Sequence, residues 1–239
     1  MIRLYTLITL LLCISAPDIV FGGEKTKIRD GDNHQDCKKW ATMGECENNP
    51  GYMRVNCIAS CNEEDKKVLG TDIAADVAHI KSFFTLQAND IDGKPFQFMN
   101  LRDKVTVIIN VASHCGYTES HYRGLVELYN SLKDTNKFEI LAFPSNQFGE
   151  QEPEQCSAIK RFAEKKGAEF RMMYKIDVNG DDAHIVYKYL KSKAGPLHIS
   201  WNFATYFVIA PDGNIRSYSG VEPMDLKDLI EELIGPEEL

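Results

Sequence analysis

A continuous apolar run that passes directly into a helical pattern constrains this chain more than any other feature. The run covers residues 105–112 and is rich in β-branched side chains, which is typical of a strand buried on both faces. Apolar residues then recur at helical spacing, at Leu125, Leu128, Tyr129 and Leu132. The segment N-V-A-S-H-C-G-Y-T-E-S-H-Y, from Asn110 to Tyr122, therefore joins a central strand to the start of a helix.

One cysteine, Cys115, lies in this connection. Free backbone N–H groups and the positive end of the helix dipole gather at a helix N-terminus. Such a position favours the thiolate, which is the nucleophilic form of cysteine. A free cysteine is often only a small buried side chain, but the residues on both sides of Cys115 are polar and typical of a loop. We therefore interpret Cys115 as a reactive thiol.

The first 22 residues predict a secretory signal peptide. A charged start at Arg3 is followed by an apolar stretch from Leu4 to Ile14, and Gly22 ends a plausible cleavage site. The apolar stretch is too short to span a bilayer, so we expect no stable membrane insertion. The expected location is the secretory pathway, either secreted or in the lumen of the endoplasmic reticulum, because the final P-E-E-L matches a retention signal only in part.

Residues 30–64 form a short, polar segment with four cysteines, Cys37, Cys46, Cys57 and Cys61. A piece of this size cannot build a large core and would need covalent links in an oxidising compartment. Four cysteines allow three pairings, and spacing alone does not choose among them. Zinc is the alternative, since Cys57 and Cys61 are close together, but the secretory route favours two disulfides and no metal.

The order of residues in this segment resembles the ShKT module, a small disulfide-bonded domain. The resemblance rests on C-K-K-W-A-T-M-G-E-C from Cys37, N-P-G-Y-M from Asn49 and C-I-A-S-C from Cys57. The first and last cysteines of the family pattern pair with each other, and both are missing here, near Asp30 and Glu64. The remaining pairing implied by the resemblance is Cys37–Cys57 and Cys46–Cys61. We expect this module to act in docking or as a spacer.

The rest of the chain predicts a linker over residues 65–81 and one α/β domain over residues 82–235. A strand, helix and strand in succession imply a parallel pair with a right-handed crossover. Further expected elements are a hairpin of 83–87 and 96–99, a strand at 138–143, a helix at 154–166, a helix capped by Asp182, strands at 203–209 and 215–218, and a helix at 225–234. This order fits a thioredoxin-like sandwich, a central mixed sheet flanked by helices.

Two more stretches carry polar groups suited to chemistry. F-P-S-N-Q-F-G-E-Q-E-P, from Phe143 to Pro153, follows the end of a strand, where open α/β sheets place their sites. Trp201-Asn202-Phe203 precedes a later strand. The indole of Trp201 is a donor only, and the amides of Gln151 and Asn202 also carry donors. Donors aimed at a sulfur anion would stabilise a thiolate and then a sulfenate.

The cysteine stretch and these two stretches resemble the three signature blocks of the glutathione peroxidase family, in the family's order. D-V-N-G-D-D-A-H from Asp177 adds a fourth match. The resemblance implies a thioredoxin-like fold in which Cys115 is the peroxidatic residue and Gln151, Trp201 and Asn202 complete a tetrad. It implies reduction of hydrogen peroxide and organic or lipid hydroperoxides through a Cys115 sulfenate, as protection against oxidative stress, with no metal or organic cofactor.

The reductant is less constrained. Family members that use thioredoxin carry a resolving cysteine near position 164, which is glutamate here. Cys156 lies about two turns earlier and is a possible resolving residue, but we favour a buried helix face of Cys156, Ile159 and Ala163. The implied reductant is therefore glutathione, thioredoxin or a disulfide isomerase. The short segment between Tyr189 and Trp201 implies a monomer with an open site, as in the phospholipid-hydroperoxide and endoplasmic-reticulum branches.

Other functions use the same residues differently. A dithiol disulfide oxidoreductase is disfavoured because Cys115-Gly-Tyr-Thr118 is C-x-x-T. A peroxide sensor, or an oxidant passing disulfides to a folding catalyst, would use the same Cys115. A secreted binding protein would act through the ShKT-like module. The net charge of −8 without a basic patch argues against nucleic acid as a partner.

Overall fold

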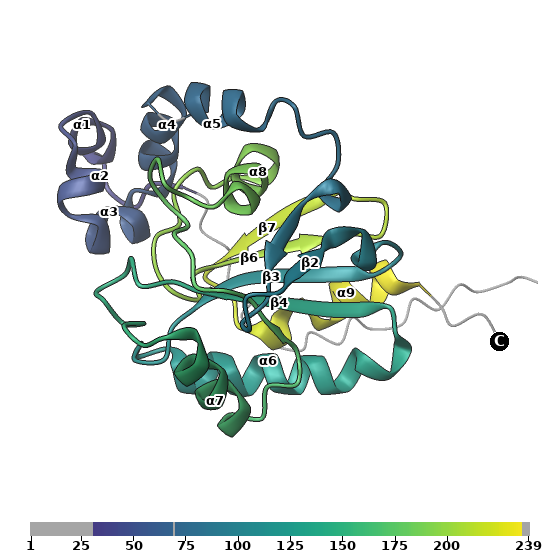
Figure 1. Ribbon diagram of the computed structural model, residues 1–239. Helices are drawn as coiled ribbons and strands as arrows, with labels where there is room; N and C mark the ends of the chain where they lie inside the picture. The colour runs from purple at the N-terminus through teal and green to yellow at the C-terminus, as the bar shows by residue number, and fades with distance from the viewer. Residues whose placement is uncertain (1–30, 69, 236–239) are drawn as a thin grey trace, which may run out of the picture.

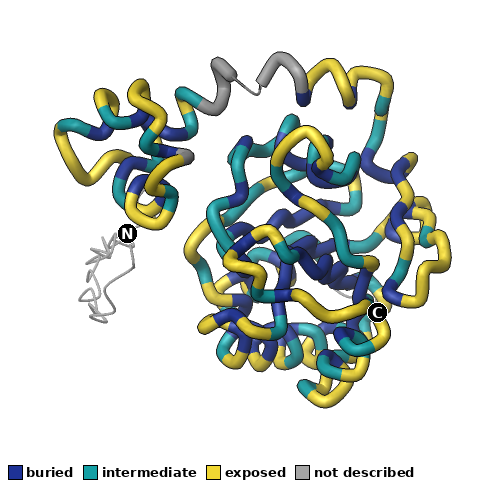
Figure 2. Tube along the Cα trace, turned by 60° about the vertical axis from the view of Figure 1, so that its left-hand side comes forward, coloured by how far each residue is buried: buried dark blue, intermediate teal, exposed yellow. Residues whose placement is uncertain are grey.

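The computed structural model describes residues 31–68 and 70–235. The expected signal peptide, residues 1–22, and the terminal P-E-E-L lie outside these residues. Buried residues concentrate in a small N-terminal module and in a larger domain (Figure 2). Among the helices of the described ranges, none combines the length and apolar character needed to cross a bilayer.

The N-terminal module is a set of short helices held by two disulfides. Its helices are α1 (Cys37–Thr42), α2 (Glu45–Asn48), α3 (Pro50–Asn56) and α4 (Ile58–Val68). The bonds Cys37–Cys57 and Cys46–Cys61 confirm the expected pairing. Apart from the four cysteines, the buried apolar residues that the structure describes in this module's cluster are Ala41 and Met53. So small a core depends on covalent links, because it removes little apolar surface from water.

A hydrogen-bonded clamp joins the two ends of this module. The carboxylate of Asp32 accepts hydrogen bonds from the backbone N of Ser60 at 3.0 Å and from its hydroxyl at 2.5 Å. Asp32 and Ser60 lie close in sequence to the two positions where the ShKT pattern has its missing first and last cysteines. Charge-assisted hydrogen bonds therefore connect the same regions of the chain that a third disulfide would connect.

The segment between the module and the domain is mostly helical. Helix α5 (Gly70–Val77) follows α4 and packs against α8 (Ile185–Ala194), as Figure 1 shows. Ile73 and Val77 of α5 are buried, and Lys188 of α8 donates to Asp76 at 2.6 Å. The segment expected to be a linker is thus docked on the domain through one face of a helix.

The domain is built on a mixed five-stranded sheet with the order β5-β4-β3-β6-β7. Its strands are β3 (Val105–Val111), β4 (Phe138–Pro144), β5 (Arg171–Met172), β6 (Thr205–Ile209) and β7 (Ile215–Ser219). The β3–β4 and β4–β5 pairs are parallel, whereas β3–β6 and β6–β7 are antiparallel. Every residue of β3 and β4 is buried, as the continuous apolar runs predict.

Helices cover both faces of the sheet (Figure 1). Helices α6 (Thr118–Leu132), α7 (Cys156–Lys165) and α9 (Lys227–Ile234) pack on one face, with Val107 and Ile109 of β3. Helices α8 and α5 pack on the other face, with Ile108 of β3. Successive strand residues thus alternate between two cores. The thioredoxin-like sandwich is confirmed.

The expected hairpin is present, but its strands are shorter and shifted. They are β1 (Gln87–Asn89) and β2 (Pro95–Gln97), and the flanking apolar residues form the 3₁₀ turns η1 (Phe83–Thr85) and η2 (Phe98–Leu101). A strand would send alternate side chains to opposite faces. The turns instead bury Phe83, Phe84 and Leu101 together in one core, so burial overrides the strand preference of these residues.

Two helix starts also differ from expectation. Asp182 does not cap α8; the cap is His184, whose Nδ1 accepts from the backbone N of Val186 at 3.3 Å. The last helix starts with a 3₁₀ turn, η4 (Pro223–Leu226), closed by a reciprocal capping box between Glu222 and Asp225. Pro223 is the first residue of that turn, where a backbone N–H would have no partner within the helix. Proline lacks this N–H, which explains why the helix starts there.

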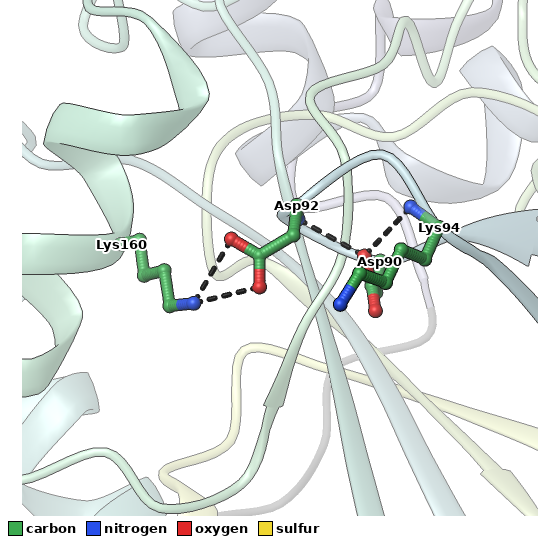
Figure 3. A network of polar contacts seen from close by, with 4 residues as sticks. All are labelled: Asp90, Asp92, Lys94 and Lys160. Carbon is green, nitrogen blue, oxygen red and sulfur yellow. Dashed lines mark hydrogen bonds and ion pairs between the residues drawn. The ribbon is translucent and has the colours of Figure 1, made fainter.

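A polar network joins the hairpin turn to α7 (Figure 3). Asp90 Oδ1 accepts from the backbone nitrogens of Asp92 and Lys94, at 3.0 and 2.9 Å, and so shapes the turn. Lys160 of α7 donates to both oxygens of Asp92, at 2.9 and 2.7 Å. Both side chains are partly exposed, so this tie positions α7 more than it stabilises the fold.

Candidate active site

Cys115 lies between the end of β3 and the start of α6, with 7% of its surface exposed. The Thr118 hydroxyl donates to Ala112 O at 2.7 Å and the Thr118 backbone N donates to Cys115 O at 3.1 Å, which closes the loop. Tyr117, the N-cap of α6, makes no capping bond with its side chain. The first amides of α6 are therefore not used by a side-chain cap and contribute a positive potential beside the sulfur.

The loop after β4 brings Gln151 to the cysteine loop. The backbone N of His114 donates to Gln151 O at 3.0 Å. Gly149 and Glu150 both have positive φ, 63° and 53°, which turns the chain sharply just before Gln151. Asn146 holds the other side of the turn by accepting from the backbone N of Glu152 at 2.8 Å. The strand end and its turn thus deliver Gln151 beside the residue that precedes Cys115.

The segment before β6 adds Trp201 and Asn202. Asn202 is buried, and its Nδ2 donates to Gln151 Oε1 at 3.4 Å. The rings of Trp201 and Phe148 lie 5.8 Å apart, so the Gln151 loop also supports the indole. Phe203 has a positive φ of 63° and packs in the same core as Cys115. The structure thus assembles the sequence-predicted residues Gln151, Trp201 and Asn202 at one site, beside the Cys115 loop.

Asn110 is an additional residue of the site, which sequence reasoning did not assign a role. It is fully buried in β3, and its Nδ2 donates to both Trp201 O and Asn202 Oδ1, each at 3.3 Å. Its backbone O accepts from Phe203 N at 3.0 Å. The signal in the sequence was an amide in a mostly apolar, buried strand, since a buried amide needs partners.

Glu152 is a second residue that sequence reasoning missed. It is fully buried, and its Oε2 accepts from the Ser113 hydroxyl at 3.1 Å. Burial raises the pKa of this carboxyl, and the hydrogen bonds from Ser113 oppose that shift. Lys175 donates to the carbonyls of residues 152, 153 and 154, at 3.2, 3.3 and 2.8 Å, and so fixes the chain after Gln151.

A buried histidine of α6, His121, packs against the segment that carries Asn202. His121 Nδ1 lies 2.5 Å from the Tyr206 hydroxyl, and its Nε2 lies 3.7 Å from Glu222. Its ring stacks on that of Phe203, the residue after Asn202, with the ring centroids 5.1 Å apart. Burial lowers the pKa of His121, and the nearby Glu222 carboxylate opposes the shift. A neutral imidazole can accept or donate at Nδ1, so the hydrogen bond between His121 and Tyr206 forms without a buried charge.

Cys156 is a free cysteine at the first position of α7. It is partly exposed and packs against the same core cluster that contains Cys115. Ile159 and Ala163, one and two turns later, are almost completely buried. Across residues 31–68 and 70–235, no group of three or more His, Cys, Asp or Glu side chains is placed to hold a metal ion.

A nearly buried thiol at the strand-to-helix junction of a thioredoxin-like sheet, with amide and indole side chains gathered beside its loop, is the arrangement expected of a thiol-dependent peroxidase. Known proteins agree. A sequence model of the family "Glutathione peroxidase" matches residues 83–191, and one of "ShK domain-like" matches residues 29–63. The chain therefore belongs to the glutathione peroxidase family and carries an ShK-like module before the peroxidase domain.

Particular relatives share most of the domain. The glutathione peroxidase-like peroxiredoxin gpx1 of Schizosaccharomyces pombe is 42% identical over 157 residues, which covers 64% of this chain and 98% of the relative. A probable mitochondrial phospholipid hydroperoxide glutathione peroxidase of Arabidopsis thaliana is 42% identical, over 65% of this chain and 68% of the relative. The crystal structure of T. cruzi GPX1 superposes with a TM-score of 0.54 at 34% identity, covering 66% of this chain and all of that one.

Proposed function

We propose that this protein reduces hydrogen peroxide and organic or lipid hydroperoxides through a Cys115 sulfenate and so protects against oxidative stress. The observation that supports this proposal is the hydrogen-bonded pair of Asn202 and Gln151 beside the Cys115 loop. The Asn202 amide is buried and the Gln151 amide is partly buried, and together they supply N–H donors without carrying a charge. An anionic sulfur is the group that such donors stabilise best.

The first step is a displacement at oxygen. The Cys115 thiolate attacks the distal peroxide oxygen, the O–O bond breaks, and the proximal oxygen leaves with a proton as water or an alcohol. Sulfur loses two electrons and the peroxide gains them. Trp201 Nε1 and the free N–H groups of Gln151 and Asn202 donate to the sulfur or oxygen anion at each stage, which is stabilisation by donors already in place.

The second half of the cycle needs thiols. One thiol condenses with the sulfenic acid, releases water and leaves a disulfide on Cys115; a second thiol reduces that disulfide. Glutathione, thioredoxin or a disulfide isomerase would supply these thiols. We assign Cys156 no required role, because its helix continues into the buried residues Ile159 and Ala163 and would have to open before Cys156 moved.

The remaining features concern access and location. The connection from α8 to Trp201 is short, and Tyr117 beside Cys115 is 57% exposed. An open site on a monomer, able to admit bulky apolar hydroperoxides, fits both features. The two disulfides of the ShK-like module fit an oxidising compartment, secreted or in the endoplasmic reticulum lumen. Residues 30–64 and 82–235 would then be separate domains joined by residues 65–81.

Peroxide consumption tests this function. The wild type and Cys115→Ser are compared with glutathione, and in parallel with a thioredoxin system and with a disulfide isomerase. We expect turnover in the wild type and none in Cys115→Ser. Turnover that survives the substitution would refute the proposal. A single equivalent of peroxide consumed with every reductant would instead indicate a peroxide sensor, and a binding function unaffected by Cys115→Ser would indicate the N-terminal module.

A further inference from the structure

The side-chain amides of the site form a chain whose direction is set at one end. Asn110 Nδ2 donates to the backbone O of Trp201 at 3.3 Å. A backbone carbonyl oxygen is an acceptor only, so Asn110 must present its NH₂ group there and not its oxygen. An amide side chain can usually be turned by 180° without a change of shape. At Asn110 the Trp201 carbonyl removes that freedom.

Each later link follows from the one before. The same Asn110 nitrogen faces Asn202 at 3.3 Å, so Asn202 must present Oδ1 to it. The NH₂ group of Asn202 then points to the other side, where it donates to Gln151 Oε1 at 3.4 Å. With its oxygen occupied, Gln151 keeps its Nε2 hydrogens for another acceptor. Three amides are therefore aligned head to tail, from β3 to the loop beside Cys115.

The alignment has a cost that a purely structural residue would avoid. Asn110 Oδ1 is buried and has no hydrogen-bond partner among the described residues. An unsatisfied buried acceptor destabilises a fold, and such a group in a native protein calls for an explanation. The explanation we draw is functional: the orientation that leaves Oδ1 unpaired is the one that gives Asn202 and Gln151 their donor directions.

We propose that Asn110 is a positioning residue for the peroxidase reaction: it fixes the amides of Asn202 and Gln151 so that N–H groups, and not carbonyl oxygens, face the Cys115 sulfur. This inference rests on the proposed function of Cys115. A carbonyl oxygen turned toward a thiolate or sulfenate would repel it, whereas an N–H group stabilises it. The strand residue thus acts on the chemistry through two other side chains.

Asn110→Asp tests the proposal, because aspartate has the same shape but only accepts when ionised. An ionised carboxylate at position 110 would accept from Asn202 and reverse the chain, so that Gln151 Nε2 is used inside it. We expect kcat/KM for hydrogen peroxide to fall about 100- to 1000-fold near neutral pH, on the scale of losing a preorganised donor. The rate of Cys115 alkylation by iodoacetamide should fall with it, because less thiolate is present.

Acidification should restore the variant relative to the wild type. A protonated, neutral carboxyl group at position 110 carries an O–H donor and can again face the Trp201 carbonyl. Several titratable groups are packed around the chain: Cys115, Glu152, Lys175, His121, Tyr122 and Tyr206 and, against the neighbouring strand residue Phe143, His184 and Tyr187. All of them are present in both proteins, and a variant that only disfavours the Cys115 thiolate would show a lower ratio of variant to wild-type alkylation rate in acid, so a rise of this ratio in acid reports protonation at position 110. We expect this ratio to rise severalfold from about pH 8 to about pH 4.

Two controls separate orientation from simple damage. Asn110→Ala removes the donor without adding a charge, so its ratio to the wild type should be low and should not rise in acid. Asn179→Asp is the matched control, because Asn179 bonds both the N and O of Ile199, at 2.9 and 2.8 Å, outside the amide chain. Its ratio should also show no recovery in acid. A flat ratio for Asn110→Asp, or a wild-type rate near pH 8, would overturn the proposal.

A measurement on the wild type covers the case in which the aspartate variant does not fold. Scalar coupling across the hydrogen bond, observed by NMR in ¹⁵N,¹³C-labelled protein, should link the Asn110 side-chain nitrogen to Asn202 Cγ. The reverse coupling, from the Asn202 nitrogen to Asn110 Cγ, would refute the proposed direction. This result does not depend on turnover, so it stays distinct from the Cys115→Ser test of the function itself.

Discussion

The Ser113 hydroxyl donates to Glu152 Oε2 across 3.1 Å and so places a fully buried carboxyl beneath the loop that carries Cys115. Glu152 directly follows Gln151, and the backbone N of His114 bonds to Gln151 O. One backbone bond and one side-chain bond therefore join the two loops of the site. Isolated buried acids are costly when ionised, which makes the protonation state of Glu152 relevant to stability.

The pH dependence of stability should report this carboxyl. Because burial raises the pKa of Glu152 in the folded state, the folded protein holds the proton to a higher pH than the unfolded chain does. The resulting stabilisation is complete below the unfolded value of about 4.3 and is lost as the pH rises through the folded pKa. Glu152→Gln keeps the shape without the titration, so its stability relative to the wild type should increase as the pH rises.

Urea unfolding of the wild type and Glu152→Gln between about pH 4 and about pH 8 checks this. Glu139→Gln is a useful comparison, because burial raises the pKa of Glu139 as well, but away from the Cys115 loop. Both variants should gain stability relative to the wild type with rising pH, and only Glu152→Gln should also alter the Cys115 alkylation rate. A constant stability difference for Glu152→Gln would show that the carboxyl does not hold its proton as inferred.

The N-terminal disulfides should matter for the module and not for the reaction. Replacing Cys46 and Cys61 together by Ala opens a loop with a sequence separation of 15 and should cost the module about 2–4 kcal/mol. The rest of its core is too small to compensate. We expect rapid proteolysis within residues 31–64 and a peroxidase rate within about twofold of the wild type, since the described residues of the module form a buried cluster separate from the one that contains Cys115. Loss of turnover would instead place the module in the catalytic cycle.

The sequence predicted the candidate site residues but not the way in which they are held. Cys115, Gln151, Trp201 and Asn202 stand in local motifs, so each was found without any knowledge of contacts. Asn110 and Asn202 bond across 92 positions, and no local pattern reports such a pair. Glu152 lay in a quoted motif, yet only the fold shows that its carboxyl is buried.

The elements of the fold likewise fall into those that the sequence predicted and those that it did not. Long buried strands such as β3 and β4 were predicted from their apolar runs. Strand β5 has two residues, too few for any periodicity, and exists because β4 offers it a parallel partner. The sequence predicted strands where the turns η1 and η2 lie, because their residues favour strands. Burial of these residues in one core favours the turns instead.

Packing of α6 against η4 gives a stability prediction. A methyl group at Gly124 would lie 2.9 Å from Cγ of Pro223, which is closer than real contacts allow. Gly124→Ala should therefore destabilise the domain by about 1–3 kcal/mol by overpacking, although alanine favours a helix by about 1 kcal/mol. Thermal unfolding of the single variants and of Gly124→Ala/Pro223→Ala checks this, because removing the proline ring should recover part of the loss. A double variant whose loss of stability equals the sum of the two single losses would show that the structure relaxes around the Gly124–Pro223 contact without strain.

The last prediction concerns Cys156: it asks whether Cys115, once oxidised, stays a sulfenic acid or forms a disulfide with Cys156. Cys156 starts α7, and the restraints on that helix include the buried Ile159 and Ala163 and the ion pair of Lys160 with Asp92 (Figure 3). A buried isoleucine reduced to alanine costs about 2–5 kcal/mol, whereas a partly exposed ion pair is worth about 0–1 kcal/mol. Apolar packing therefore keeps Cys156 in place, and the ion pair adds little.

One equivalent of peroxide, followed by dimedone and mass spectrometry, should give the same Cys115 sulfenic adduct in the wild type and in Cys156→Ser. In Ile159→Ala, part of the Cys115 sulfenic acid should instead condense with the Cys156 thiol, releasing water and forming a Cys115–Cys156 disulfide, so that less dimedone adduct is found. Asp92→Asn should leave the ratio of adduct to disulfide nearly unchanged. If the wild type instead loses two hydrogens and traps no dimedone, while Cys156→Ser traps it fully, then Cys156 is the resolving cysteine. In that case α7 opens during every cycle, and a protein dithiol rather than glutathione becomes the expected reductant, because one dithiol can reduce an internal disulfide completely and leave as a disulfide itself.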